Sequence, residues 1–161
     1  MNRIKWILPM LIIAVMLGGC PYKSDIPLDA TGKKINPALL GVWEPKSSSD
    51  EKYTVTKANE TTYSISKTSK NSKEPTVYKG FAVDVDGTTF LNLQQQGEMA
   101  DKGYYIYKME TNAAATKLTL QGMTENVTET FKTAEEFKAF VKKYKGLSFF
   151  YDKTEDVYNK D

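Results

Sequence analysis

Short segments in which apolar and polar residues alternate are the feature that most limits the fold of this chain of 161 residues. Alternation with a period of two places successive side chains on opposite faces of a β-strand. The segments recur every dozen residues or so, with turn-forming residues between them, which is typical of an antiparallel meander. The eight predicted strands are residues 40–44, 53–55, 63–65, 81–85, 90–93, 104–109, 118–120 and 127–131.

One turn in this series has a specific sequence signal. Asp86 and Gly87 separate the alternating run that ends at Val85 from the run that begins near Phe90. An Asp-Gly pair between two such runs favours a tight hairpin, because both turn positions need a positive φ. We therefore expect these two strands to be adjacent and antiparallel.

The period changes after residue 131, which predicts one helix. Thr133 and Glu136 have the spacing of a capping box at its start, and Gly146 is predicted to end it in a left-handed conformation. Lysines occupy the opposite face, so we expect the apolar stripe to dock on the sheet rather than on a membrane or partner. Residues 147–151 are predicted to be extended again. The apolar stripe consists of Phe137, Phe140, Val141 and Tyr144.

Composition excludes several function classes. The chain has no histidine, and its single cysteine is Cys20. Of the 22 basic residues, Arg3 and Lys5 precede this cysteine, so 20 lysines face 20 acidic residues in the remainder. Without histidine, arginine or net positive charge, we expect no metal site, no cofactor, no enzymatic activity and no nucleic-acid binding.

The N-terminus has the pattern of an export signal. Arg3 and Lys5 supply positive charge, and residues 6–17 form an apolar run. This run is shorter than the roughly 20 residues that a membrane-spanning helix needs. Two small residues, Gly18 and Gly19, then precede Cys20.

The tetrapeptide Leu17-Gly18-Gly19-Cys20 resembles the lipobox of bacterial lipoproteins. The resemblance implies cleavage before Cys20, lipid attachment to its sulfur and a membrane-anchored protein of the cell envelope. An ordinary secretory signal is the alternative, but it leaves a lone exported thiol unexplained. Pro21 stands where an Asp would resemble an inner-membrane retention signal, so the outer membrane is favoured over the inner one.

The chain divides into three predicted parts. Residues 1–19 are the lipoprotein signal peptide. Residues 20–36 contain prolines, a glycine and scattered charge without an apolar period, which predicts a lipidated N-terminus followed by a flexible tether. Residues 37–161 form a single β-rich domain, with enough aromatic residues for a substantial core.

The triplet Gly41-Val42-Trp43 on the first predicted strand resembles the G-x-W signature of lipocalins, within the broader calycin group. The resemblance implies an antiparallel up-and-down β-barrel whose base is closed by Trp43, with a late helix. An open sheet or a small sandwich capped by the helix is the alternative fold. The chain departs from the lipocalin pattern because it lacks the arginine that packs over this tryptophan.

Two functions follow from this fold class. In the first, the barrel is a non-enzymatic binding module that encloses a small hydrophobic ligand, as the lipocalin resemblance implies. In the second, the barrel is filled and acts as a protein–protein interaction module of the envelope, either as an accessory protein or as an inhibitor. The candidate ligand-binding residues are Trp43, Gly80, Ala82, Tyr105 and Tyr107.

Overall fold

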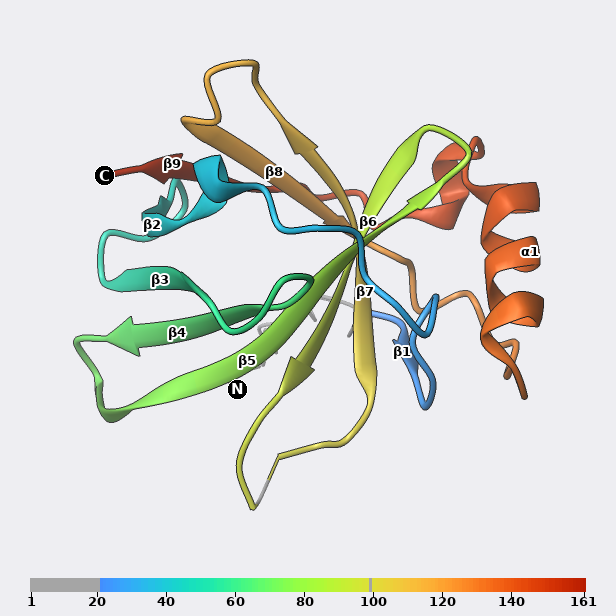
Figure 1. Cartoon of the computed structure of the whole chain (residues 1–161), viewed down its shortest axis with the longest axis horizontal. Helices are drawn as coiled ribbons and strands as arrows, with labels where there is room; N and C mark the ends of the chain where they lie inside the picture. The colour runs from blue at the N-terminus through green and yellow to red at the C-terminus, as the bar shows by residue number, and fades with distance from the viewer. Residues whose placement is uncertain (1–20, 99) are drawn as a thin grey trace, which may run out of the picture.

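The chain folds into a closed antiparallel barrel with one α-helix against its outer surface (Figure 1). This computed structural model describes residues 21–98 and 100–161. Within them, eight strands form the barrel, and neighbours in the sequence are neighbours in the sheet. The predicted fold class, a mainly β up-and-down barrel with a C-terminal helix, is confirmed, and the open sheet and the sandwich are excluded. The barrel strands are β2 (Gly41–Pro45), β3 (Glu51–Lys57), β4 (Tyr63–Ser69), β5 (Ser72–Val85), β6 (Thr88–Gln95), β7 (Tyr104–Thr111), β8 (Lys117–Gly122) and β9 (Asp156–Lys160).

The alternation of side chains sorts each strand into an inner and an outer face. On β6, Leu91 pairs with Tyr107 of β7 and faces the barrel interior, whereas Phe90 faces outward. The turn between β5 and β6 is the two-residue hairpin that the sequence predicts. Asp86 has a φ of 53° and Gly87 a φ of 81°, the positive values that such a turn requires.

The strand that closes the barrel is not the predicted one. Residues 127–131 run unpaired, and their apolar side chains cover the outer core. The closing strand is β9, which pairs with both β8 and β2. The prediction for residues 147–151 is also wrong, because Ser148–Phe150 form a 3₁₀ helix. The sequence does not predict β9, because two of its three inward residues, Asp156 and Lys160, are charged and the strand therefore lacks the alternation of apolar and polar residues.

The helix α1 (Ala134–Tyr144) begins as predicted and ends differently. The Thr133 side chain accepts a hydrogen bond from the Glu136 amide at 3.2 Å, which satisfies one of the free donors of the first turn. At the other end, Lys145 keeps a right-handed helical conformation, and Gly146 has no positive φ. The predicted left-handed glycine cap is therefore absent, and the Leu147 amide instead donates to the Tyr144 carbonyl at 2.9 Å.

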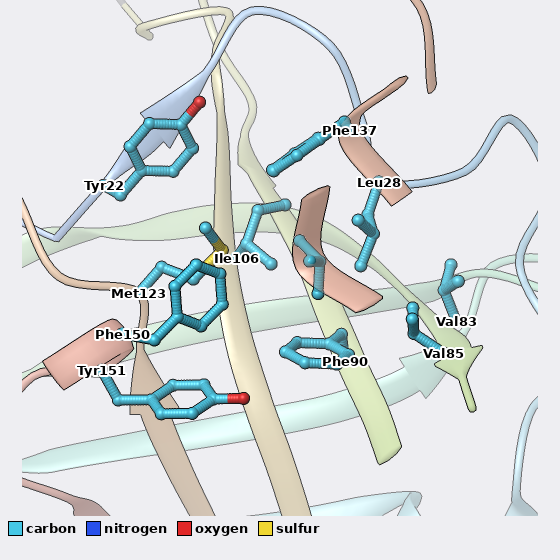
Figure 2. Close-up of a cluster of buried hydrophobic side chains, with 11 residues drawn as sticks. Tyr22, Leu28, Val83, Val85, Phe90, Ile106, Met123, Phe137, Phe150 and Tyr151 are labelled. Carbon is cyan, nitrogen blue, oxygen red and sulfur yellow. The ribbon is translucent and has the colours of Figure 1, made fainter. Parts of the chain in front are cut away.

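An outer core lies between α1 and the outward faces of β5, β6 and β7 (Figure 2). Phe137 and Val141 of α1 are fully buried there, so the apolar stripe docks on the sheet as expected. Phe131 stacks on Phe137 with ring centroids 4.6 Å apart. This core fixes one side of the barrel and leaves the strands β2 to β4 on the opposite side, as Figure 1 shows.

Residues 21–36 pack against the barrel, so the expected flexible tether is wrong for this segment. The short strand β1 (Lys23–Ser24) pairs with the start of β7. Leu28 is fully buried, and its amide donates to the side-chain oxygen of Asn92 at 2.7 Å. Asp29 forms an ion pair with Lys138 of α1 at 2.5 Å. The folded unit therefore includes this segment, because Ile26 and Leu28 pack on the outer core and Ile35 packs against the cluster around Trp43.

A second core closes one end of the barrel from inside. The segment before β2 crosses this end and includes the 3₁₀ helix Pro37–Leu39. Trp43 is 1% exposed, and its indole N–H donates to the Leu39 carbonyl at 2.9 Å. The Tyr63 hydroxyl accepts from the Asn36 amide at 2.6 Å. These bonds attach the crossing segment to the barrel, so this end is shut and the opposite end is the open one.

Candidate functional site

The barrel encloses a cavity of about 380 Å³ that reaches its open end. Inward-facing residues from all eight barrel strands contribute to its wall, so the cavity is the barrel interior itself. Its volume lies in the range of small-molecule binding sites. Trp43 lies between the cavity and the closed end, where it forms the floor.

The wall combines two kinds of side chain. Aliphatic residues supply apolar surface, and a belt of tyrosines adds aromatic rings and hydroxyl groups, with Tyr53 and Tyr158 packed beside the floor residue Trp43. Within the described residues, the hydroxyls of Tyr78, Tyr105 and Tyr107 have no hydrogen-bond partner, so they are free to bind a ligand. The aliphatic residues are Val55, Ile65, Leu91, Leu93, Leu118 and Leu120, and the tyrosines are Tyr53, Tyr78, Tyr105, Tyr107 and Tyr158.

Polar side chains gather on the inner face near the mouth. Lys67 of β4 forms an ion pair with Glu51 of β3 at 2.7 Å, with both side chains about 30% exposed. The same ammonium lies 5.7 Å from the ring centroid of Tyr53, whose hydroxyl donates to Glu51 at 3.3 Å. The wall thus offers apolar and hydroxyl-bearing side chains, with a charged pair near the entrance.

Burial controls the charge of the groups around the cavity. It raises the pKa of Tyr107 and of Tyr158 well above the ordinary value for tyrosine. Both phenols are therefore neutral at physiological pH and can donate hydrogen bonds. Burial also raises the pKa of Asp156, which lines the cavity near its mouth, above its usual value.

The structure brings together three of the five predicted ligand-binding residues. Trp43, Tyr105 and Tyr107 line the cavity. Gly80 faces inward but lies behind the wall, since a Cβ atom there would be 3.1 Å from Ile65 Cδ1. Ala82 lies nearer the closed end, on a separate pocket of about 260 Å³. The prediction that Gly80 and Ala82 belong to the cavity wall is therefore corrected: larger neighbours cover Gly80, and Ala82 lies farther along the barrel on another pocket.

Sequence reasoning missed three of the five tyrosines of the belt, which are Tyr53, Tyr78 and Tyr158. Tyr53 and Tyr158 pack edge to face with ring centroids 5.3 Å apart, and Tyr78 faces them from β5. Tyr53 lies on a predicted strand, and Tyr78 lies just before another one. The alternation of side chains along each strand therefore places both tyrosines on the inner face. Tyr158 gave no such signal because its strand was not predicted.

Lys160 occupies a place that the lipocalin resemblance assigns to arginine. It lies on the last strand, with its ammonium 5.7 Å from the ring centroid of Trp43. The same ammonium donates to the Ala38 carbonyl at 2.7 Å. A cation therefore covers the floor tryptophan, and it also connects the last strand to the segment that closes the barrel.

Cys20 and the predicted signal peptide lie outside the described residues. Within residues 21–98 and 100–161, no helix combines the length and the apolar character needed to cross a membrane. The same residues contain no group of three or more acidic, histidine or cysteine side chains placed to hold a metal ion. No family model, no curated protein and no solved structure matches this chain.

Proposed function

We propose that this protein is a lipid-anchored bacterial envelope protein whose barrel binds a small amphipathic molecule without chemical conversion. One observation carries the ligand assignment: a cavity of about 380 Å³ whose wall combines aliphatic side chains with tyrosine rings and hydroxyls. An apolar ligand body fits against Trp43 and the aliphatic residues. A polar end fits near the tyrosine hydroxyls and the Glu51–Lys67 pair.

The anchor assignment rests on sequence. The residues Leu17-Gly18-Gly19-Cys20 follow a charged and apolar N-terminus as they do in bacterial lipoproteins. Attached acyl chains stabilise membrane binding by about 0.8 kcal/mol per buried methylene group, so several long chains give permanent anchoring. Pro21 after the cysteine favours the outer membrane as the destination.

The cavity favours ligand binding over a purely structural interaction module. That alternative requires a filled barrel, and the interior between Trp43 and the mouth is hollow.

The ligand proposal is tested with the apolar dye N-phenyl-1-naphthylamine, excited directly. We expect saturable fluorescence enhancement with the native chain. Leu93→Trp should weaken it, because the larger ring takes up part of the cavity from its wall. Val77→Trp is the matched control, since Val77 is exposed on the outer face of the adjacent strand. Equal dye binding by Leu93→Trp, or none by the native chain, would contradict the proposal.

The anchor proposal is tested separately with radiolabelled palmitate in a bacterial host. The native chain should incorporate the label, and Cys20→Ser should not, because Cys20 carries the only thiol in the sequence. Equal incorporation by both chains would exclude lipid attachment at this residue.

A further inference from the structure

The described chain begins at the lip of the cavity. Pro21 lines the cavity together with Tyr107 and Leu120. A Cβ atom built on the inward-facing Gly122, the last residue of β8, would lie 3.4 Å from Pro21 Cβ and 3.6 Å from Tyr107 Cε1. The chain thus enters the barrel domain at its open end rather than at its side or base.

Pro21 is held there by the residues that follow it. The Tyr22 amide donates to the Met123 carbonyl at 2.9 Å, and the Tyr22 hydroxyl donates to the Glu129 carbonyl at 2.9 Å. Tyr22 is 8% exposed. Lys23 pairs with β7 in the sheet and forms an ion pair with Asp101. These contacts of residues 22 and 23 hold Pro21 in a fixed position against the barrel.

Covalent geometry then limits where the anchor starts. Cys20 is bonded to Pro21, and consecutive Cα atoms are about 3.8 Å apart. A lipid on Cys20 therefore begins within one residue of the cavity lip. We infer that the anchor holds the open end of the barrel against the bilayer, so that the cavity exchanges its amphipathic ligand directly with that membrane. This inference rests on the proposed function, from which it takes both the lipid and the ligand.

The surface around the mouth suits a lipid headgroup layer. Three of its lysines are paired with carboxylates, as Lys52–Glu44 at 2.7 Å, Lys67–Glu51 at 2.7 Å and Lys70–Asp50 at 2.6 Å, so positive and negative groups are interspersed there. No large field of one sign repels anionic or zwitterionic lipids. The opposite end is shut by the segment bonded to Trp43 and Tyr63, so the mouth is the route by which a ligand enters.

The orientation is tested with a fluorophore on one added cysteine, in the lipoprotein purified from membranes and reconstituted in vesicles. The vesicles contain phosphatidylcholine and phosphatidylglycerol with a headgroup nitroxide quencher. A label at Lys102→Cys lies near the mouth, next to the residue that pairs with Lys23. A label at Ala114→Cys lies on the β7–β8 loop at the closed end. We expect strong quenching at residue 102 and little at residue 114. Equal quenching, or stronger quenching at residue 114, would overturn the inference.

Ligand exchange is tested by separating the anchor from the lip. A flexible Gly/Ser insertion of about 16 residues between Pro21 and Tyr22 has a reach of roughly 22 Å. Because effective concentration falls as about the −3/2 power of linker length, lengthening the link from one residue to about 17 lowers it roughly 70-fold, and we expect dye transfer from vesicle to protein to slow at least ~10-fold. The same insertion between Ala113 and Ala114 is the matched control and should leave transfer unchanged.

Two outcomes separate this inference from the proposed function. Dye affinity is first measured in detergent-free solution on the same chains without their lipid. Dye binding by all chains, followed by equally fast transfer with and without the linker, would overturn the inference alone. Failure of the native chain to bind dye would overturn the proposed function, and the inference with it.

Discussion

The ammonium of Lys160, on the last strand, lies 5.7 Å from the ring centroid of Trp43 on the first strand of the barrel. A cation over an indole stabilises by about 0.5–1 kcal/mol where it is partly exposed, and the added hydrogen bond to Ala38 contributes about 0.5–1.5 kcal/mol. We therefore expect Lys160→Ala to lower the free energy of unfolding by about 1–2 kcal/mol in urea titrations. Lys160→Arg should retain most of this stability. Equal losses in both variants would show that the cation does not matter.

Trp43 is the largest of the fully buried side chains, and it joins the cavity floor to the closed end. Removing its ring loses transfer free energy and leaves a void, so Trp43→Ala should cost about 3–5 kcal/mol. Trp43→Phe keeps much of the volume but loses the bond to the Leu39 carbonyl, so its cost should be smaller. Thermal denaturation compares the two variants. An unchanged melting temperature for Trp43→Ala would contradict the role of this residue as a closure.

Asn92 fixes the N-terminal segment to the barrel. Its side chain is fully buried, and its oxygen accepts from the Leu28 amide at 2.7 Å. Asn92→Ala leaves that buried amide without a partner, which should cost about 1–3 kcal/mol. Hydrogen exchange should increase across residues 21–36 in particular. Asn159→Ala is the control, since Asn159 is exposed on β9. Uniform exchange changes throughout the barrel would argue against a local clamp.

The parts of the fold that were predictable are those with a local signal. The tight turn at Asp86-Gly87 and the cap at Thr133 follow from residue types that favour one backbone conformation. The first seven barrel strands follow from alternation. The closing strand β9 does not, because Tyr158 alone carries an apolar inward side chain, and the pairing of its charged neighbours depends on strands far away in sequence.

The sequence predicted that the barrel interior holds the site, but it did not predict all of the residues that line the cavity. Strand parity places Tyr105 and Tyr107 on the inner face, and the structure puts both in the cavity. Parity cannot say how far along the barrel axis a residue lies, which is why Ala82 was grouped with the wrong pocket. The docking of residues 21–36 was also hidden from local reasoning. It depends on contacts such as Leu28 with Asn92, 64 residues apart.

Asp156 lines the cavity without an ion-pair partner among the described residues, and burial raises its pKa above the ordinary value of 3.8. The folded state thus binds the proton more tightly than the unfolded chain does. Stability from this group is fully present below pH 3.8 and is lost as pH rises through the raised pKa. Asp156→Asn, which resembles the protonated acid, should therefore be more stable than the native chain at pH 7 and equal to it at low pH.

The opposite sign is expected for Asp29, whose pKa is lowered chiefly by its hydrogen bond with Lys138. That carboxylate stabilises the fold above pH 3.8, and the stabilisation is lost as pH falls through the lowered pKa. Asp29→Asn should therefore be less stable than the native chain at pH 7, with the difference vanishing in acid. Urea titrations of both variants across this pH range measure the two differences. Because the variants make the same chemical change, destabilisation by both at pH 7 would show that burial at the cavity mouth does not disfavour the charged form of Asp156.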